Sequence, residues 1–151
     1  MLRARLSDEL KTAMKAKNQR AVSTVRLILA ALKDRDIAAR TKGNTDGISD
    51  EEIGDLLQKM IRQRHESIEL YERGNRQDLA RQEREEIAII ERFLPKQMSE
   101  GEMAEAVSGV VAELGVSSIK DMGRVMAALK QRHSGHMDFS KASALVKQRL
   151  S

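Results

Sequence analysis

Apolar residues recur every three or four positions along most of this chain, and no segment alternates between apolar and polar residues. The first series, Leu2, Leu6, Leu10 and Met14, places one apolar stripe on an α-helix. A strand that buries one face needs a period of two residues instead. The sequence therefore predicts an all-α fold without strands.

Composition narrows the class of protein to which the chain can belong. The chain contains no cysteine, which removes disulfides, thiolate metal sites and cysteine nucleophiles together. No apolar run approaches the roughly 20 residues that span a bilayer. Residues 1–17 carry charges throughout and lack the apolar segment of a signal peptide. We therefore expect a soluble, cytoplasmic protein with no membrane partner.

Local signals divide the first 94 residues into four helices. Ser49 and Glu52 form the pattern of a capping box that opens a long helix. We expect Gly74 to end that helix and Asn75 to cap the next one. That fourth helix should end just before Pro95, because proline disfavours a helical residue before it.

Beyond Pro95 the helices shorten. Capping patterns begin at three places: Ser99 with Glu102, Ser118 with Asp121, and Asp138. We predict a four-helix N-terminal domain over 1–94, a hinge over 95–99, and a small three-helix tail domain over 100–151.

Charge is divided along the chain. Residues 1–40 have a net charge of +6, residues 41–114 a net charge of −7, and residues 115–151 a net charge of +5. This division favours either complementarity within the molecule or an anionic partner for the basic surfaces. For charge alone, ordinary solvated helix faces are the simpler interpretation.

Catalytic patterns are absent from the sequence. The serines cluster where helices begin, which indicates capping rather than nucleophilic catalysis. Adjacent carboxylates such as Glu85 and Glu86 do not face one another on a helix. We predict no catalytic residue, no cofactor and no small-molecule substrate.

Two further patterns have a structural interpretation beside a functional one. His133, His136 and Asp138 have a spacing that metal ligands can adopt. The interruption of the helix expected at Gly135 argues against a fixed metal site. Met122 and Met126 lie four residues apart. This spacing usually places residues in a helical core, and less often on an exposed hydrophobic surface that binds a partner.

The last 37 residues are rich in basic side chains. Seven cations stand there against two acids, enough to contact several phosphates. Phe139 is the only aromatic residue in this region, so base stacking is disfavoured. Contact with the backbone of a folded RNA fits better.

The stretch from Ile119 to Leu150 resembles the C-terminal tail domain of the B subunit of glutamine-dependent tRNA amidotransferases. The resemblance rests on KDMG, a following V-M, a glycine-bearing loop, an Asp cap and a final VK..L. The whole chain, with its FLPKQMSEGE junction, resembles the free-standing YqeY-like family. It departs from the tail pattern at Ala127, where a second glycine is common, and in the two histidines of the loop before Asp138.

This resemblance implies an accessory role with tRNA, because the tail helps those enzymes to hold tRNA. A family label of carbon–nitrogen ligase with glutamine as amido donor would be inherited from the whole enzyme, whose catalytic subunits this chain lacks. The charge pattern and the resemblance together give the expected RNA-contacting residues: Lys120, Gly123, Arg124, Lys130, Lys141 and Lys147.

Three functional hypotheses follow. The first is tRNA binding through the basic C-terminal helices. The second is a protein-interaction module that docks on an aminoacyl-tRNA synthetase or an amidotransferase. The third and weakest is participation in glutamine-dependent carbon–nitrogen ligation within a larger complex.

Overall fold

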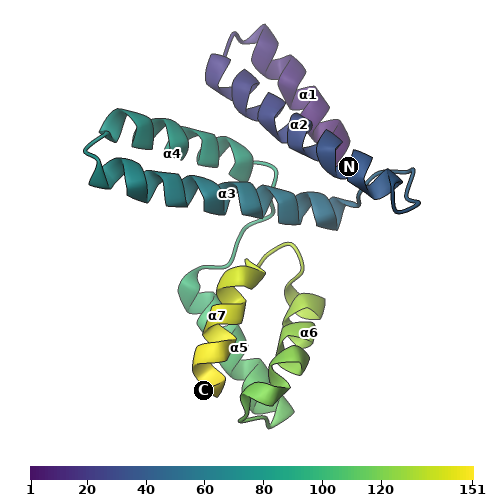
Figure 1. The fold of residues 1–151 in the computed structure, drawn as a ribbon, viewed down its shortest axis with the longest axis vertical. Helices are drawn as coiled ribbons and strands as arrows, with labels where there is room; N and C mark the ends of the chain where they lie inside the picture. The colour runs from purple at the N-terminus through teal and green to yellow at the C-terminus, as the bar shows by residue number, and fades with distance from the viewer. The chain divides into compact units, whose positions relative to one another are not determined.

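The computed structural model describes all 151 residues, and every regular element in it is helical (Figure 1). The elements are α1 (Leu2–Lys15), α2 (Gln19–Arg40), α3 (Asp50–Arg73), α4 (Gln77–Glu91), α5 (Glu100–Leu114), a 3₁₀ turn η1 (Ile119–Asp121), α6 (Met122–His133) and α7 (Phe139–Leu150). The prediction of an all-α chain is confirmed, with four helices followed by three. No helix combines the length and the apolar character that crossing a bilayer requires.

The chain forms two compact units, Met1–Leu94 and Pro95–Ser151. In the first unit, α1 pairs with α2 and α3 pairs with α4, so that two helical hairpins pack together (Figure 1). Val25 and Ile28 of α2 and Ile53 and Leu57 of α3 are fully buried in the shared core. A smaller apolar cluster, which includes Ile68, Ala80 and Ile87, continues between α3 and α4.

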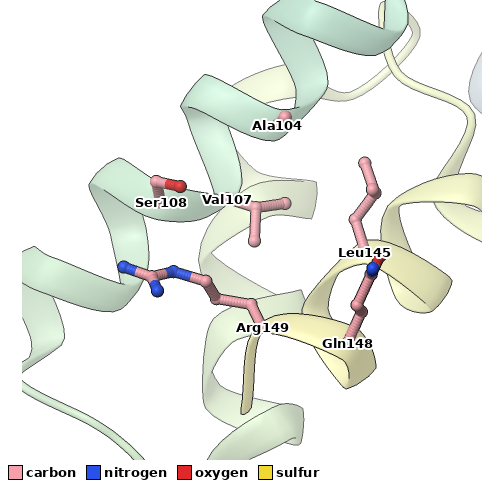
Figure 2. A pocket seen from close by; sticks show the side chains of 6 residues that line it. All are labelled: Ala104, Val107, Ser108, Leu145, Gln148 and Arg149. Carbon is pink, nitrogen blue, oxygen red and sulfur yellow. The ribbon is translucent and has the colours of Figure 1, made fainter. Parts of the chain in front are cut away.

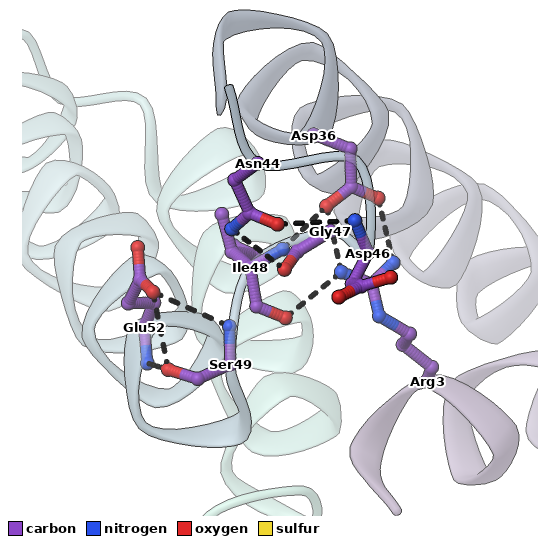
Figure 3. A network of polar contacts seen from close by, with 8 residues as sticks. All are labelled: Arg3, Asp36, Asn44, Asp46, Gly47, Ile48, Ser49 and Glu52. Carbon is purple, nitrogen blue, oxygen red and sulfur yellow. Dashed lines mark hydrogen bonds and ion pairs between the residues drawn. The ribbon is translucent and has the colours of Figure 1, made fainter. Parts of the chain in front are cut away.

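A polar network ties α1 to α2 and to the loop that follows α2 (Figure 3). The Arg3 guanidinium donates to both oxygens of Asp36 at 2.6 Å, and its Nη2 also donates to the Ile48 carbonyl at 2.9 Å. Asp36 Oδ1 accepts a further hydrogen bond from the Ile48 amide at 2.9 Å. The Arg3 guanidinium holds the pKa of the Asp36 carboxyl down at about 2. One ion pair thus anchors the loop before α3.

A second ionic cluster joins α2, α3 and α4. Arg64 of α3 is largely buried, and its Nε lies 3.0 Å from Glu86 Oε2 and 4.0 Å from Glu83 Oε2. Arg20 of α2 also contacts α4, where its Nε lies 3.3 Å from Glu85 Oε2. Burial, reinforced by the nearby Glu86 charge, raises the pKa of Glu83.

Helix ends show where local signals succeed and where they fail. The capping boxes at Ser49 and Ser99 are both present with reciprocal hydrogen bonds. Gly74 is the C-cap residue that ends α3, as predicted, but the assignment of Asn75 as the cap of the next helix is wrong. Asn75, not glycine, takes the left-handed conformation after α3, with φ of 57°, and α4 begins without a side-chain cap. Asparagine tolerates this conformation better than most residues. Asn75 can therefore belong to the end of α3, although it was expected to cap the start of α4.

The second unit contains three helices around a separate core. Val107 of α5, Val125 and Leu129 of α6, and Ala142 and Val146 of α7 are buried together. Met122 and Met126 pack against this core and are only partly exposed, which favours the core interpretation of their spacing. These two methionines therefore contribute to packing within the second unit.

The segment expected to act as a hinge is tied into the second unit. Gln97 Nε2 donates to the Gly135 carbonyl at 2.7 Å, and the Met98 amide donates to the His136 carbonyl at 2.8 Å. His136 Nδ1 lies 3.1 Å from the Lys96 carbonyl oxygen. These bonds hold the start of the unit against the α6–α7 loop. Bending of the chain at residues 95–99 stays a prediction.

Candidate nucleic-acid interface

The candidate interface begins at the turn that leads into α6. The Ser118 hydroxyl accepts a hydrogen bond from the Lys120 amide at 3.3 Å, and a 3₁₀ turn precedes the α-helix. The sequence predicted a helix that begins with the capping pattern of Ser118 and Asp121. The structure instead begins with a 3₁₀ turn, which is wound more tightly than an α-helix. It places Lys120 in the turn itself, where its side chain is exposed.

The helix α7 begins as predicted. Asp138 accepts hydrogen bonds from the amides of Ser140 at 3.0 Å and Lys141 at 3.4 Å. Such a cap satisfies amides that would otherwise lack partners at the helix start. Asp138 therefore has a structural role as the N-cap of α7. No group of three or more His, Asp or Glu side chains is assembled into a metal-binding arrangement in the structure.

All six residues predicted to contact RNA lie on the exposed surface of the second unit, in η1, α6 and α7. Because α6 and α7 bury the faces that carry Val125, Leu129 and Val146, the basic residues are left on the outer faces. The structure brings the six onto neighbouring elements. It does not enclose them in a single pocket.

Most of these cations have no acidic partner. Lys120, Lys130, Lys141 and Lys147 form no ion pair. Arg124 Nη1 lies 3.8 Å from Asp121 Oδ1, a long contact between exposed side chains. Exposed pairs of this kind contribute little, so Arg124 can still engage another anion.

Arg132 differs from its neighbours. Its guanidinium donates to both carboxylate oxygens of Glu113 on α5 at 2.7 and 2.8 Å. These hydrogen bonds lower the pKa of Glu113 and raise that of Arg132. Counting basic residues along the sequence includes Arg132 among the free cations, yet this bridge gives it a fixed partner.

Gly123 is the one uncharged residue of the predicted set. A Cβ atom added at this position would meet nothing within 4 Å, and the backbone has ordinary helical angles. Packing therefore does not require a glycine here, although glycine weakens a helix by about 0.5–1 kcal/mol relative to alanine. The bare backbone is open to the outside of α6.

Arg149 is a further cation that the predicted set omits. It lines a hollow of about 320 Å³ between α5 and α7, together with Val107, Ser108 and Leu145. Figure 2 shows its side chain extending from α7 toward Ser108 of α5. The exposed guanidinium lies on the α5 side of α7 and adds to the positive charge of the unit.

Several curated relatives of this chain share one name. The chain is 36% identical over 117 residues to "Altered inheritance of mitochondria protein 41, mitochondrial" of Lachancea thermotolerans, and the match covers 76% of this chain and 60% of the relative. The protein of that name in Candida glabrata is 33% identical over 89 residues, covering 59% and 47%. The chain thus spans about half to three-fifths of these relatives' length.

A third protein of this name, from Pyrenophora tritici-repentis, is 31% identical over 134 residues, covering 85% of this chain and 71% of the relative. The names of these relatives contradict the cytoplasmic prediction, because they describe mitochondrial proteins. That prediction rested on the missing signal peptide. Such an argument addresses secretion and says nothing of import into an organelle.

The family comparison covers nearly the whole chain. The model described as "Yqey-like protein" matches residues 3–150, which include both compact units and the predicted interface. This match confirms the resemblance of the whole chain to the YqeY-like family. The chain belongs to the Yqey-like protein family.

Proposed function

We propose that this protein is an accessory tRNA-binding protein that contacts the tRNA backbone through the basic surface of η1, α6 and α7. The observation that carries the proposal is the group of four lysines, Lys120, Lys130, Lys141 and Lys147, that are exposed and lack any acidic partner. Phosphate groups are the natural counterions for such a surface, because each contact releases condensed counterions from the RNA.

The distribution of acids within the second unit supports the same surface. Its glutamates, Glu100, Glu102, Glu105 and Glu113, all lie on α5, whereas α6 and α7 carry cations. The two remaining acids are Asp121 of η1, which lies 3.8 Å from Arg124, and Asp138, which caps α7. RNA approaching α6 and α7 would therefore meet positive charge, and α5 would repel it. This asymmetry orients an anionic partner on the unit.

Glycine at position 123 adds a shape argument. Its open backbone allows a ribose or phosphate group to approach α6 more closely than any side chain would permit. Arg124 stands beside this spot and can donate several hydrogen bonds to one phosphate. Recognition would depend on backbone shape and charge, since the surface offers little aromatic area for stacking.

Charge reversal tests the proposal directly. We expect Arg124→Glu combined with Lys147→Glu to weaken binding of a bulk tRNA pool by at least about tenfold, in line with the loss of two phosphate contacts. Lys59→Glu is the matched control, because Lys59 is an exposed cation of α3 in the other unit. Equal weakening by both variants, or no binding by the native chain, would refute the proposal.

A further inference from the structure

A second surface, in the first unit, has a different character. The outward side of α2 next to α1 combines apolar and basic side chains in one stripe: Val22, Arg26, Leu29, Lys33, Ile37 and Arg40. We call the seam between α1 and α2 that these residues line the α1–α2 groove. It contains two hollows of about 460 and 400 Å³.

The apolar residues of the groove are accessible. Ile37 is 48% exposed, and Met14 of α1, which lines the same seam, is 51% exposed. Val22 and Leu29 are partly buried and form the floor. Exposed apolar residues in a concave seam are characteristic of a surface that receives another apolar element.

The cations of the groove are available for a partner. Arg26, Lys33 and Arg40 form no ion pair, and neither does Lys17 at the end of the seam. Asp36 also lines the groove, but both of its oxygens already accept hydrogen bonds from Arg3. The groove therefore presents net positive charge beside its apolar floor, although Arg40 lies near enough to Asp36 to help lower the pKa of that carboxyl.

The spacing of these residues indicates the shape of the partner. Arg26, Lys33 and Arg40 recur every seven residues, and Val22 and Leu29 are likewise seven apart. A heptad repeat keeps one stripe in register with a second helix over several turns. From Val22 to Arg40 the stripe extends about 27 Å at the usual helical rise, which is the length of a five-turn helix.

We propose that the α1–α2 groove binds an amphipathic helix of a partner protein, with apolar residues along one stripe and acidic residues on both sides of it. Such a helix places its apolar side chains in the two hollows, and its carboxylates meet Arg26, Lys33 and Arg40. This surface and its partner are independent of the RNA surface proposed for the second unit.

Other anionic partners fit the groove less well. RNA would lay phosphates against half-exposed Ile37 and Met14 and gain nothing from their burial. An anionic bilayer accepts protruding apolar side chains, whereas these residues line a concave seam between two helices. A helix satisfies both the apolar hollows and the charges.

The test uses a labelled synthetic peptide of three heptads, with Leu at the two core positions and Glu at the flanking positions. Fluorescence anisotropy measures its binding to the full chain, and a peptide with Lys in place of Glu serves as the charge control. We expect the acidic peptide to bind and the basic peptide not to bind. Absence of binding by the acidic peptide, or equal binding of both, would overturn the proposal.

Variants of the chain then locate the site. Lys33→Glu and Ile37→Ser should each weaken peptide binding by about tenfold. Arg35→Glu is the matched control, since Arg35 is an exposed cation of the same helix that does not line the groove and should leave binding unchanged. If Arg35→Glu weakens binding as much as Lys33→Glu does, the effect is nonspecific and the proposal fails.

Measurements on the same variants separate the other occupants. If Lys33→Glu instead lowers tRNA affinity or binding to anionic phospholipid vesicles, and leaves peptide binding intact, the groove belongs to that anion and the proposal is wrong. If sedimentation shows self-association that Lys33→Glu abolishes, a second copy is the occupant and the proposal is wrong as well. Unchanged tRNA affinity and a monomeric chain accompany the result we expect.

Discussion

At the scale of single residues, Asp36 couples the anchoring of a loop to pH. Arg3 lowers the pKa of this carboxyl to about 2, below its value in an unfolded chain. Between that value and about 4 the unfolded state binds more protons, so Asp36 contributes stability above this window and loses it as the pH falls through it. The anchor should therefore weaken only in strong acid.

Asp36→Asn tests this assignment. We expect the substitution to lower the free energy of unfolding at neutral pH by about 1–3 kcal/mol, because it removes a charge-assisted pair of hydrogen bonds. The difference from the native chain should shrink between about pH 4 and 2. Urea unfolding at several pH values measures both effects, and a difference that grows on acidification would contradict the assignment.

Gly123 allows stability and RNA binding to be separated. Gly123→Ala should raise the free energy of unfolding by up to about 1 kcal/mol, because alanine favours helix and no neighbouring atom obstructs its Cβ. The same methyl group should weaken tRNA binding if the backbone of α6 approaches the RNA. The prediction is a variant that is more stable and binds less tightly.

Gly109→Ala is the matched control for this experiment. Gly109 lies within α5, and a Cβ added there also meets nothing within 4 Å. It should stabilise the chain similarly and leave tRNA binding unchanged. Loss of binding in both variants, or in neither, would remove Gly123 from the interface.

At the scale of helices, the end of α1 carries an unusual residue. Lys17 adopts φ of 56°, a left-handed conformation that glycine enters without steric cost. The amide of Lys17 donates to the Met14 carbonyl at 3.2 Å and that of Asn18 to the Ala13 carbonyl at 3.0 Å, so the helix end is well formed despite this conformation.

Lys17→Gly should therefore stabilise the chain by about 0.5–1 kcal/mol, once the greater freedom of glycine in the unfolded state is counted. Asn75→Gly is the comparison, since Asn75 has a similar φ of 57° and asparagine tolerates it better. Thermal unfolding should show a larger gain for Lys17→Gly. A larger gain for Asn75→Gly would contradict this account.

The same scale shows what sequence alone can predict. The caps at Ser49, Ser99 and Asp138 were predictable because each bond joins residues within three positions of one another. The anchor between Arg3 and Asp36 was not predictable, because its partners lie 33 residues apart and meet only when α1 packs on α2. Local chemistry determines where helices begin. Packing determines which charges meet.

At the scale of the whole molecule, this distinction applies to both surfaces. Helical periodicity was sufficient to predict that Lys130 and Lys147 would be exposed, since each directly follows a core residue of its helix, Leu129 or Val146. Periodicity could not predict that Arg132 is held by Glu113, 19 residues earlier. The α1–α2 groove could not be predicted from residue spacing alone, because it forms only where α1 packs against α2.

The protein contains two candidate surfaces on two compact units, each with net positive charge and each suited to a different partner. The surface of α6 and α7 is basic with small, open positions, which fits an RNA backbone. The α1–α2 groove alternates cations with apolar residues, which fits a helix. An accessory protein that joins a tRNA to a protein partner accounts for both.

The most direct test of this account is a titration of a bulk tRNA pool with the full chain at salt concentrations from about 50 to 200 mM. With three to five phosphate contacts, affinity should fall by on the order of 10²-fold across this range. The double variant Arg124→Glu and Lys147→Glu should show weaker binding and a shallower salt dependence. Binding that does not change with salt, or no binding at the lowest salt, would contradict the central claim.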